Sequence, residues 1–256
     1  MDLGLKQKNV LITGGSKGIG LACARAFVAE GAQVALVSRS EENLKKANIK
    51  GAFTVAADLT DASAAAAMVE RVENDFGPID VLVNSAGAAK RTDADDLTPA
   101  AWRAGMDAKY FSYINVIDPV IKRMGKRGRG AIINVIGNGG KVASPTHLAG
   151  GAANAALLLA TAGLAYAYAG KGVRVVGVSP GVTKTERVAQ GLKAEAKRAN
   201  LSEEQAYKQM ISRLPMGRPA EPEEIADIVV FAASERGRYL TGANISTDGA
   251  ASHVVI

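Results

Sequence analysis

The stretch NVLITGGSKGIGLACARAFVAEG, residues 9–31, joins a short apolar run to a glycine-rich turn and then to a helical pattern. In such a turn, glycines permit a tight reversal and let the backbone approach a pyrophosphate, which then lies at the positive N-terminus of the helix. A glycine triplet alone is a weak signal, but its position between a strand and a helix makes it strong. The stretch therefore predicts a dinucleotide-binding unit of one strand and one helix.

The same alternation of strand and helix continues along the chain. Most of the apolar runs are continuous, as is typical of strands buried on both faces. We expect strands at Asn9–Thr13, Gln33–Ser38, Ala52–Ala56, Val81–Asn84, Ala131–Ile136, Arg174–Ser179 and Asn244–Thr247. We expect helices near Gly18–Glu30, Ala62–Phe76, Pro99–Met124, Gly151–Ala169 and Pro222–Ser234. The pattern predicts one α/β domain over residues 1–256, with a doubly wound, parallel seven-stranded sheet and helices on both faces.

Composition limits the classes of protein to consider. With 48% hydrophobic and 22% charged residues, the chain has an ordinary composition for a soluble globular protein. Its net charge of +6 favours an anionic small ligand or a weak polyanion contact. A single cysteine, Cys23, excludes an intrachain disulfide, and with only two histidines no metal site is expected. We expect a reducing compartment, the cytoplasm.

Two further stretches bear on partners. The uncharged stretch 148–170 is long enough to cross a bilayer, but it is mostly alanine and glycine, so we expect a helix in a core or a subunit interface. A basic cluster lies near the end of the helix expected at Pro99–Met124. Without interleaved aromatics it is interpreted as a solvated helix end and not a nucleic-acid site. The cluster comprises Lys122, Arg123, Lys126, Arg127 and Arg129. We therefore expect neither a nucleic acid nor a membrane as a partner.

The end of the second strand indicates which nicotinamide nucleotide fits. A carboxylate there would accept the ribose 2′-hydroxyl of NAD, whereas this sequence has Ser38-Arg39. Arg39 can hold a 2′-phosphate with its charged fork, and Lys17 in the glycine turn can add a second positive charge. Either residue alone is more often a solvated surface charge, but together they favour NADP(H) as the cofactor.

Five motifs together resemble the short-chain dehydrogenase/reductase family. They are TGGSKGIG at 13–20, Asp58-Leu59, Asn84-Ser85-Ala86-Gly87, Pro180-Gly181 and LTGANISTDG at 240–249. The resemblance covers essentially the whole chain and implies a single-domain Rossmann fold that binds NAD(P). It also implies a homo-oligomer, a dimer or a homotetramer, assembled through the 148–170 helix.

The resemblance also assigns positions to the cofactor. The glycine turn contributes Gly14, Ser16, Lys17, Gly18, Ile19 and Gly20, and the end of the second strand contributes Ser38 and Arg39. By the same resemblance, Asp58 and Leu59 flank the adenine, and Asn84, Ala86 and Gly87 line the middle of the cofactor. Pro180, Gly181, Val182 and Thr183 meet the nicotinamide.

The catalytic positions depart from the family. Members usually carry a serine, a tyrosine, a lysine four residues after the tyrosine, and an asparagine on the fourth helix. Alignment on Ala131–Val135 places Gly137 at the serine position and Gly150 at the tyrosine position. Asn154 falls on the lysine position, and Lys109 falls on the asparagine position. Glycine has no proton to give, so positions 137 and 150 cannot perform the family's roles.

Substitute catalytic residues are His147, Lys109 and Asn154. Lysine and asparagine have thus exchanged positions, with Lys109 at the asparagine position and Asn154 at the lysine position. The exchange either retains a positive charge near the nicotinamide or arose by chance through sequence drift. His147, whose unperturbed pKa lies near neutrality, is a proton-donor candidate or simply a surface residue. Glycines in 137–140 and 150–151 suggest an open wall where the family's catalytic side chains stand.

The charged segment 184–218 is an insertion of helical character between a strand end and the last helix. It either covers a substrate at the carboxyl ends of the strands or forms a solvated helical pair. The leading hypothesis for the whole chain is an NADP(H)-dependent oxidoreductase of a small carbonyl or alcohol, with an atypical catalytic centre. The alternative is an inactive NADP-binding protein that acts as a sensor or as the partner of an active subunit.

Overall fold

The computed structural model describes residues 1–87 and 89–254, without the side chains of residues 194 and 198. A 7-stranded parallel sheet runs through the molecule in the order β3-β2-β1-β4-β5-β6-β7. The strands are β1 (Asn9–Thr13), β2 (Gln33–Ser38), β3 (Phe53–Ala56), β4 (Val81–Asn84), β5 (Gly130–Val135), β6 (Val173–Pro180) and β7 (Asn244–Thr247). The order reverses between β1 and β4, where an open sheet of this kind binds its ligand. This architecture confirms the predicted doubly wound Rossmann fold.

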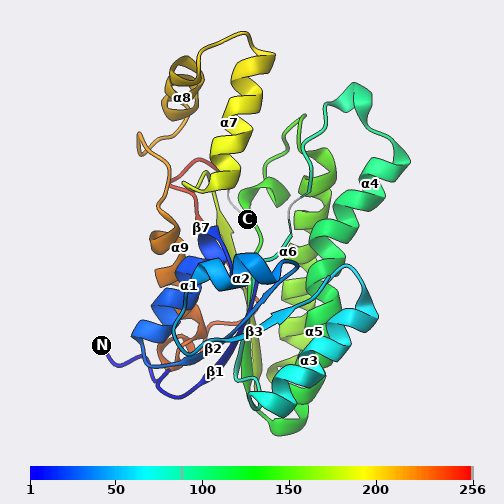
Figure 1. Ribbon diagram of the computed structural model, residues 1–256, viewed down its shortest axis with the longest axis vertical. Helices are drawn as coiled ribbons and strands as arrows, with labels where there is room; N and C mark the ends of the chain where they lie inside the picture. The colour runs from blue at the N-terminus through cyan, green and yellow to red at the C-terminus, as the bar shows by residue number, and fades with distance from the viewer. Residues whose placement is uncertain (88, 255–256) are drawn as a thin grey trace.

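Helices cover both faces of the sheet (Figure 1). On one face, α1 (Gly18–Ala29), α2 (Glu41–Ala47) and α9 (Pro222–Ala233) share a core with the strands, built around Phe27, Leu36 and Val229. On the other face, α3 (Ala62–Asp75), α5 (Ser112–Arg127) and α6 (Leu148–Ala169) enclose a second core. The expected strands and helices are all present, and α2 is an additional short helix.

The helix expected at Pro99–Met124 is not continuous. It consists of α4 (Pro99–Met106), a π-helical turn η2 (Asp107–Phe111) and α5. A π turn adds a residue to the helical repeat and rotates the side chains that follow, and such turns are frequent at functional sites. Lys109 lies inside this turn, so the irregularity decides where its ammonium points.

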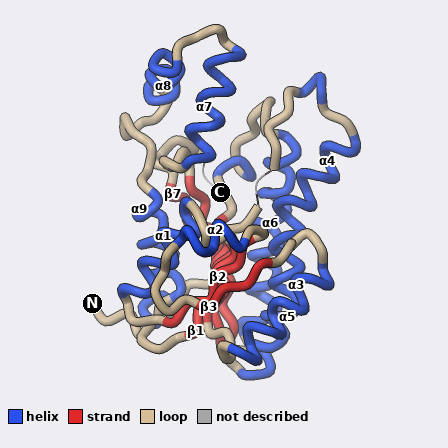
Figure 2. Tube along the Cα trace, viewed as in Figure 1, coloured by secondary structure: helices blue, strands red, loops and turns tan. Residues whose placement is uncertain are grey.

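The segment 184–218 forms the helical pair that its composition suggests. It contains α7 (Glu186–Arg198) and α8 (Glu203–Ser212), which stand beyond the carboxyl ends of the strands, opposite α4 (Figures 1 and 2). The side chain of Thr185 caps α7, and a reciprocal Ser202–Gln205 capping box begins α8. The pair is therefore locally encoded, and its role as a substrate cover remains a prediction.

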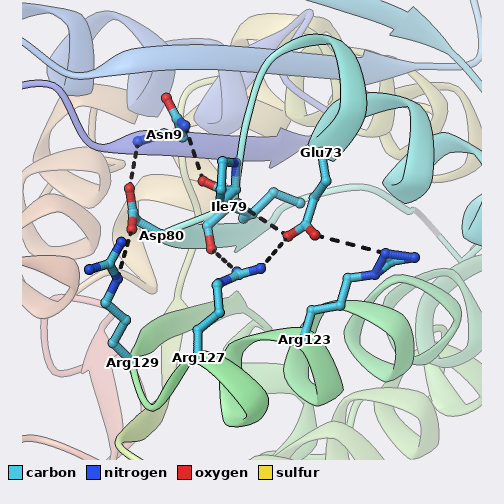
Figure 3. A network of polar contacts seen from close by, with 8 residues as sticks. Asn9, Glu73, Ile79, Asp80, Arg123, Arg127 and Arg129 are labelled. Carbon is cyan, nitrogen blue, oxygen red and sulfur yellow. Dashed lines mark hydrogen bonds and ion pairs between the residues drawn. The ribbon is translucent and has the colours of Figure 1, made fainter.

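The expectation that the basic cluster is a solvated helix end is wrong for Arg123 and Arg127, whose side chains are partly buried in ion pairs, whereas Arg129 is exposed (Figure 3). Arg127 lies 2.8 Å from Glu73 on α3, and Arg123 lies 3.8 Å from the same carboxylate. Arg129 lies 3.7 Å from Asp80, just before β4. These ion pairs tie α3 and α5 to the amino ends of the central strands, far along the sheet from the glycine turn.

The apolar helix α6 is long and apolar enough to cross a membrane by length and composition alone. In the fold it packs against β6 and α4, and 39% of its most apolar window is buried. Its inner face includes Leu157 and Thr161, whose hydroxyl accepts a 3.0 Å hydrogen bond from Asn134 on β5. Its outer face exposes Leu159 and Tyr166.

Candidate functional site

The glycine turn, residues 14–20, joins β1 to α1 with few side chains over its backbone. Gly14 adopts a φ of +67°, which side chains rarely tolerate, and a Cβ on Gly20 would overlap the carbonyl oxygen of Gly14. Lys17, at the N-cap of α1, makes no capping hydrogen bond with its side chain, so the first N–H groups of the helix have no side-chain acceptor. Ser16, Gly18 and Ile19 complete the turn into the first helical residues. The turn is therefore shaped for a close anionic ligand such as a pyrophosphate.

Beside this turn lies the end of β2. Ser16 and Ser38 are joined by a 3.2 Å hydrogen bond between their hydroxyls. Arg39 is exposed next to Asp58, where hydrogen bonds from Thr60, together with the charge of Arg39, lower the pKa of the Asp58 carboxyl. Lys17 instead reaches α7, where its ammonium lies 3.5 Å from Glu186. The structure thus brings Arg39 to the expected corner and directs Lys17 toward the helical pair.

Some of the residues assigned to the cofactor by resemblance have side chains committed to the core. Asn84 is fully buried, accepts a hydrogen bond from Thr13 and donates one to Asn134. The side chain of Leu59 is buried against the α3 and α5 face of the sheet. Only their backbone atoms can meet a ligand, together with Ala86 and Gly87 in the loop after β4.

The segment after β6 closes the same edge of the sheet. Pro180 ends β6 and Gly181 follows, while the carbonyl of Val182 accepts a 2.9 Å hydrogen bond from Ala220 before α9. Thr183 is buried and bridges to Ala220. A Cβ on Gly18 would lie 3.2 Å from Thr185, so the start of α7 sits directly over the glycine turn.

His147 and Asn154 lie beside Gly137 and Gly150, the positions that we aligned from the sequence with a serine and a tyrosine. Gly150 has no side chain, and the imidazole of His147 fills the space: a Cβ there would overlap Cε1 of the ring and lie 2.5 Å from Nε2. A Cβ on Gly137 would lie 3.3 Å from Nδ2 of Asn154. His147 and Asn154 both lie within 3.4 Å of the point that a Cβ on Gly139 would occupy. The structure therefore brings together two of the three substitute residues that the sequence suggests.

Two buried polar atoms at this centre lack a partner among the described residues. They are Nδ1 of His147 and Oδ1 of Asn154, and neither makes a hydrogen bond within that part of the chain. Buried polar atoms are almost always paired, and exceptions mark unfilled binding sites or catalytic groups. Both atoms are therefore available to a ligand at this point.

Lys109, the third substitute residue, is buried on the η2 turn. Its ammonium donates to the Tyr113 hydroxyl at 2.7 Å and to the Val135 carbonyl at 2.9 Å. Burial, with a smaller effect of Arg187, lowers the pKa of Lys109 to about 7. Tyr113 is fully buried, and its hydroxyl donates to the same carbonyl, so it is a core residue. One N–H of Lys109 remains for another partner.

Comparison with known proteins supplies the family. A sequence model of the family described as enoyl-(acyl carrier protein) reductase matches residues 14–251. A 3alpha-hydroxysteroid dehydrogenase of Mediterraneibacter gnavus is 32% identical over 98% of this chain and 99% of its own length. An acetoacetyl-CoA reductase of Shinella zoogloeoides is 36% identical over 93% of this chain and 96% of its own length. The chain belongs to the short-chain dehydrogenase/reductase family.

A solved structure agrees with this assignment. The L-sorbose reductase of Gluconobacter frateurii, in complex with NADPH and L-sorbose, superposes with a TM-score of 0.91. It is 29% identical and covers 97% of this chain and 98% of its own chain. Membership assigns this chain to the oxidoreductases that use a nicotinamide nucleotide. This chain has glycines, Gly137 and Gly150, at the positions that we aligned from the sequence with the family's serine and tyrosine.

Positive charge gathers around the centre, and sequence reasoning missed two of the residues that supply it. Burial lowers the pKa of His147, and the charges of Arg91, Arg187 and Lys109 lower it further. Arg187 comes from α7 and Arg91 from the loop after β4. No spacing in the sequence relates these two residues to His147, so only the fold could bring them together.

The expected open wall is wrong. A Cβ on Gly140 would lie 2.9 Å from the backbone of Asn154 and Ala155, and a Cβ on Gly151 would lie 2.9 Å from the Gly139 carbonyl. The glycines therefore let the 138–140 turn pack directly against α6. The space near Gly150 is likewise filled by His147, as shown above.

Two cavities lie outside this centre. The larger, of about 690 Å³, lies at the amino ends of the strands, beside Lys8, Asp80 and Arg174. Ligands of an open α/β sheet bind at the opposite, carboxyl ends, so the larger cavity is not the active site. The smaller, of about 190 Å³, lies beside Val182, Met216 and Thr247, where β6 and β7 end. Of these two cavities, the smaller adjoins the segment assigned to the nicotinamide.

Proposed function

We propose that the chain is an NADP(H)-dependent oxidoreductase acting on a small carbonyl or alcohol through His147 and Lys109. The observation that carries the proposal is the imidazole of His147 in the space left by Gly150, at the family's tyrosine position. A titratable ring there can form a hydrogen bond to a reacting oxygen, as the tyrosine hydroxyl does in the family. Asn154 lies beside it with an unpaired oxygen.

The residues present fit the nucleotide. Glycine at positions 14 and 20 lets the turn pack against the Ser85–Ala86 backbone and against itself, where a Cβ would collide. This tight turn leads into the N-terminus of α1, which suits a pyrophosphate. Arg39 stands where NAD-specific chains carry a carboxylate, which supports NADP over NAD. When bound, the nucleotide supplies or accepts the hydride.

His147 and Lys109 are the two side chains that we assign to proton transfer. Burial and the nearby positive charges lower the pKa of His147 and so favour its neutral ring, which can orient a substrate oxygen or accept a proton from an alcohol. Lys109, with a pKa of about 7, can hold or release a proton near neutral pH. General acid–base catalysis is most effective when the group's pKa lies close to the working pH.

The test is a titration of the protein with NADPH and NADH by nucleotide fluorescence, followed by a turnover screen on aldehydes, ketones and quinones. We expect His147→Ala to lower kcat by about 10²–10⁴-fold while NADPH still binds. His253→Ala, which removes the exposed second histidine, should leave kcat unchanged. An unchanged kcat in His147→Ala would remove His147 from the mechanism.

The cofactor preference has its own test. Arg39→Ala should weaken NADPH binding by about tenfold or more and leave NADH binding nearly unchanged, because only NADPH carries the 2′-phosphate. Lys17→Ala should cost less, since the Lys17 ammonium is already paired with Glu186. Equal losses for both nucleotides in Arg39→Ala would reject the assignment of the 2′-phosphate to Arg39.

A second candidate is a chain that binds NADP without turnover, as a sensor or as the partner of an active subunit. The observation that favours it is the absence of a side chain at both Gly137 and Gly150. Tight NADPH binding with no turnover across the panel would support this candidate. Turnover that depends on His147 would reject it.

We also propose that the protein acts on a small-molecule substrate as a homo-oligomer, a dimer or tetramer formed through α6, in the cytoplasm. The exposed apolar side chains of α6 support the interface, and the buried thiol of Cys23 suits a reducing compartment. Neither a nucleic acid nor a membrane is part of this proposal. Among the described residues, no group of three or more His, Cys, Asp or Glu side chains could hold a metal ion.

A further inference from the structure

Two arginines near the catalytic centre make little use of their hydrogen-bonding groups. Arg187 donates one hydrogen bond, to the Ala89 carbonyl at 3.3 Å, and Arg91 donates one, to the Thr146 hydroxyl at 3.3 Å. A guanidinium carries five N–H donors, so most of them remain free on each side chain. Within residues 1–87 and 89–254, as far as side chains are described, neither arginine lies within ion-pair distance of a carboxylate.

Some arginines of the fold instead join structural elements with two or more hydrogen bonds each. Arg174 donates to four backbone carbonyls at 2.7–3.2 Å, and Arg218 binds Glu224 through two hydrogen bonds of 2.6 and 2.7 Å. Arg127 holds both Glu73 and the Ile79 carbonyl. Arg91 and Arg187 therefore differ from the arginines that hold the structure together.

Their hydrogen bonds place both arginines at the rim of the site. Arg187 reaches from α7 to Ala89, two residues before Arg91. The loop that carries Arg91 is bound to Thr146, the residue before His147, through Arg91 itself and through a 3.2 Å backbone hydrogen bond from Thr92. Three segments far apart in the sequence thus meet beside the imidazole.

The electrostatics agree with this placement. The charge of Arg187 lowers the pKa of Lys109 beyond the effect of burial, and the charges of Arg91 and Arg187 act in the same way on His147. Both arginines are solvent-exposed, and partial burial together with the charge of Arg91 lowers the pKa of Arg187. Like charges held together without a counterion repel one another, and an anion would relieve that repulsion.

We propose that Arg91 and Arg187 form a subsite for an anionic group, a carboxylate or a phosphate, on the substrate whose carbonyl or alcohol reacts beside His147. The planar forks of two arginines match the oxygens of either group. This inference rests on the proposed function, because it assigns the substrate class of the same site. It selects acidic carbonyl compounds and alcohols over neutral ones.

The experiment measures binding by calorimetry, with the protein saturated by NADP⁺ so that a ketone probe cannot turn over. Acetoacetate is compared with methyl acetoacetate, and dihydroxyacetone phosphate with dihydroxyacetone. We expect one anionic probe to bind about tenfold or more tightly than its neutral counterpart. Arg187→Gln and Arg91→Gln should each remove most of that preference. Arg25→Gln, an exposed arginine on α1 two turns beyond the glycine turn, should retain it.

The outcomes are distinct. Carboxylate and phosphate are told apart by which pair shows the preference. Equal binding of charged and neutral probes, no binding of either anion at millimolar concentration, or a preference kept in Arg187→Gln would overturn the proposal. A loss of NADP⁺ affinity in Arg187→Gln equal to its loss of probe affinity would also overturn it, because the arginine would then hold the cofactor. NADP⁺ binding of the unaltered protein is measured first, and its absence would count against the proposed function alone.

Discussion

At Gly150 a missing side chain makes room for an imidazole. The residue lies in the first turn of α6, three positions after His147, and any Cβ there would collide with the ring. We predict that Gly150→Ala displaces His147 and lowers kcat by at least about tenfold, while NADPH affinity is retained. The measurement is steady-state kinetics beside a fluorescence titration.

Gly163→Ala is the matched control, because it lies on the same helix with no atom within 4 Å of its Cβ position. Alanine is favoured over glycine in a helix by about 1 kcal/mol, so this variant should be slightly more stable. Because Gly163 lies on the outer face of α6 between Leu159 and Tyr166, the kcat of the variant is compared with that of the unaltered protein in the same state of assembly. If Gly150→Ala has the kcat of the unaltered protein, the ring position has no part in turnover.

Lys109 makes stability depend on pH. Its pKa is 10.5 in the unfolded chain and about 7 in the folded one, so between these values the unfolded state binds a proton that the folded state does not. The contribution of Lys109 therefore raises the free energy of unfolding from pH 7 toward pH 10. Below pH 7 the buried ammonium is charged in the folded state, and its full desolvation cost destabilises the fold. Lys109→Met removes that cost, and Tyr113 keeps its hydrogen bond to Val135.

We predict that Lys109→Met is more stable than the unaltered protein below pH 7 and that the difference shrinks as pH rises toward 10. Urea unfolding at a series of pH values measures it. Lys50→Met, at an exposed loop position, should show no such trend. A constant difference across the series would mean that Lys109 does not titrate in this window.

Among the elements, α7 is held at its base by the glycine turn. The Lys17–Glu186 pair is exposed, and its side chains retain 55% and 75% of their accessible surface, so it adds little to stability. The pair affects phosphate binding at the glycine turn, because the Glu186 carboxylate neutralises the Lys17 ammonium and repels a phosphate. We predict that Glu186→Gln lowers the Kd for NADPH and NADH by ~2–5-fold at low salt, and that added salt reduces the effect.

Glu203→Gln on α8 is the control for this prediction, since Glu203 lies 4.0 Å from Lys193, away from the glycine turn. It should leave both affinities unchanged. A weaker affinity in Glu186→Gln would show that the pair holds α7 in its binding position and that its charge does not oppose the cofactor.

Elements differed in how far the sequence could predict them. Buried strands were located within a residue or two, because continuous apolar runs have few other uses in a chain of this size. The short helix α2 was missed, although Ser40 caps its start and Asn48 ends it in a left-handed conformation. The π turn that aims Lys109 was missed because a single added residue leaves the apolar periodicity of α4 and α5 nearly intact.

At the scale of the whole molecule, the order of strands and helices along the chain predicted the nucleotide-binding part of the site. In a parallel sheet every strand ends at the same edge, so the turns after β1, β2, β4 and β6 had to meet there. The approach of Arg91 and Arg187 to His147 could not be predicted, because it depends on how α7 and the loop after β4 fold back over that edge. The buried Thr13–Asn84–Asn134–Thr161 network was missed for the same reason.

At the scale of the whole molecule, we expect α6 to determine how subunits assemble. Its outer face exposes 77% of Leu159 and 92% of Tyr166, and apolar side chains on a long helix of small residues suit a close isologous contact. We predict that the protein sediments as a dimer or tetramer and that Leu159→Glu yields smaller species, because a charge buried in an interface has no partner. Val28→Glu, at an exposed position on α1, should leave the mass unchanged. A monomer for the unaltered protein, or an unchanged assembly in Leu159→Glu, would place any interface elsewhere than the outer face of α6.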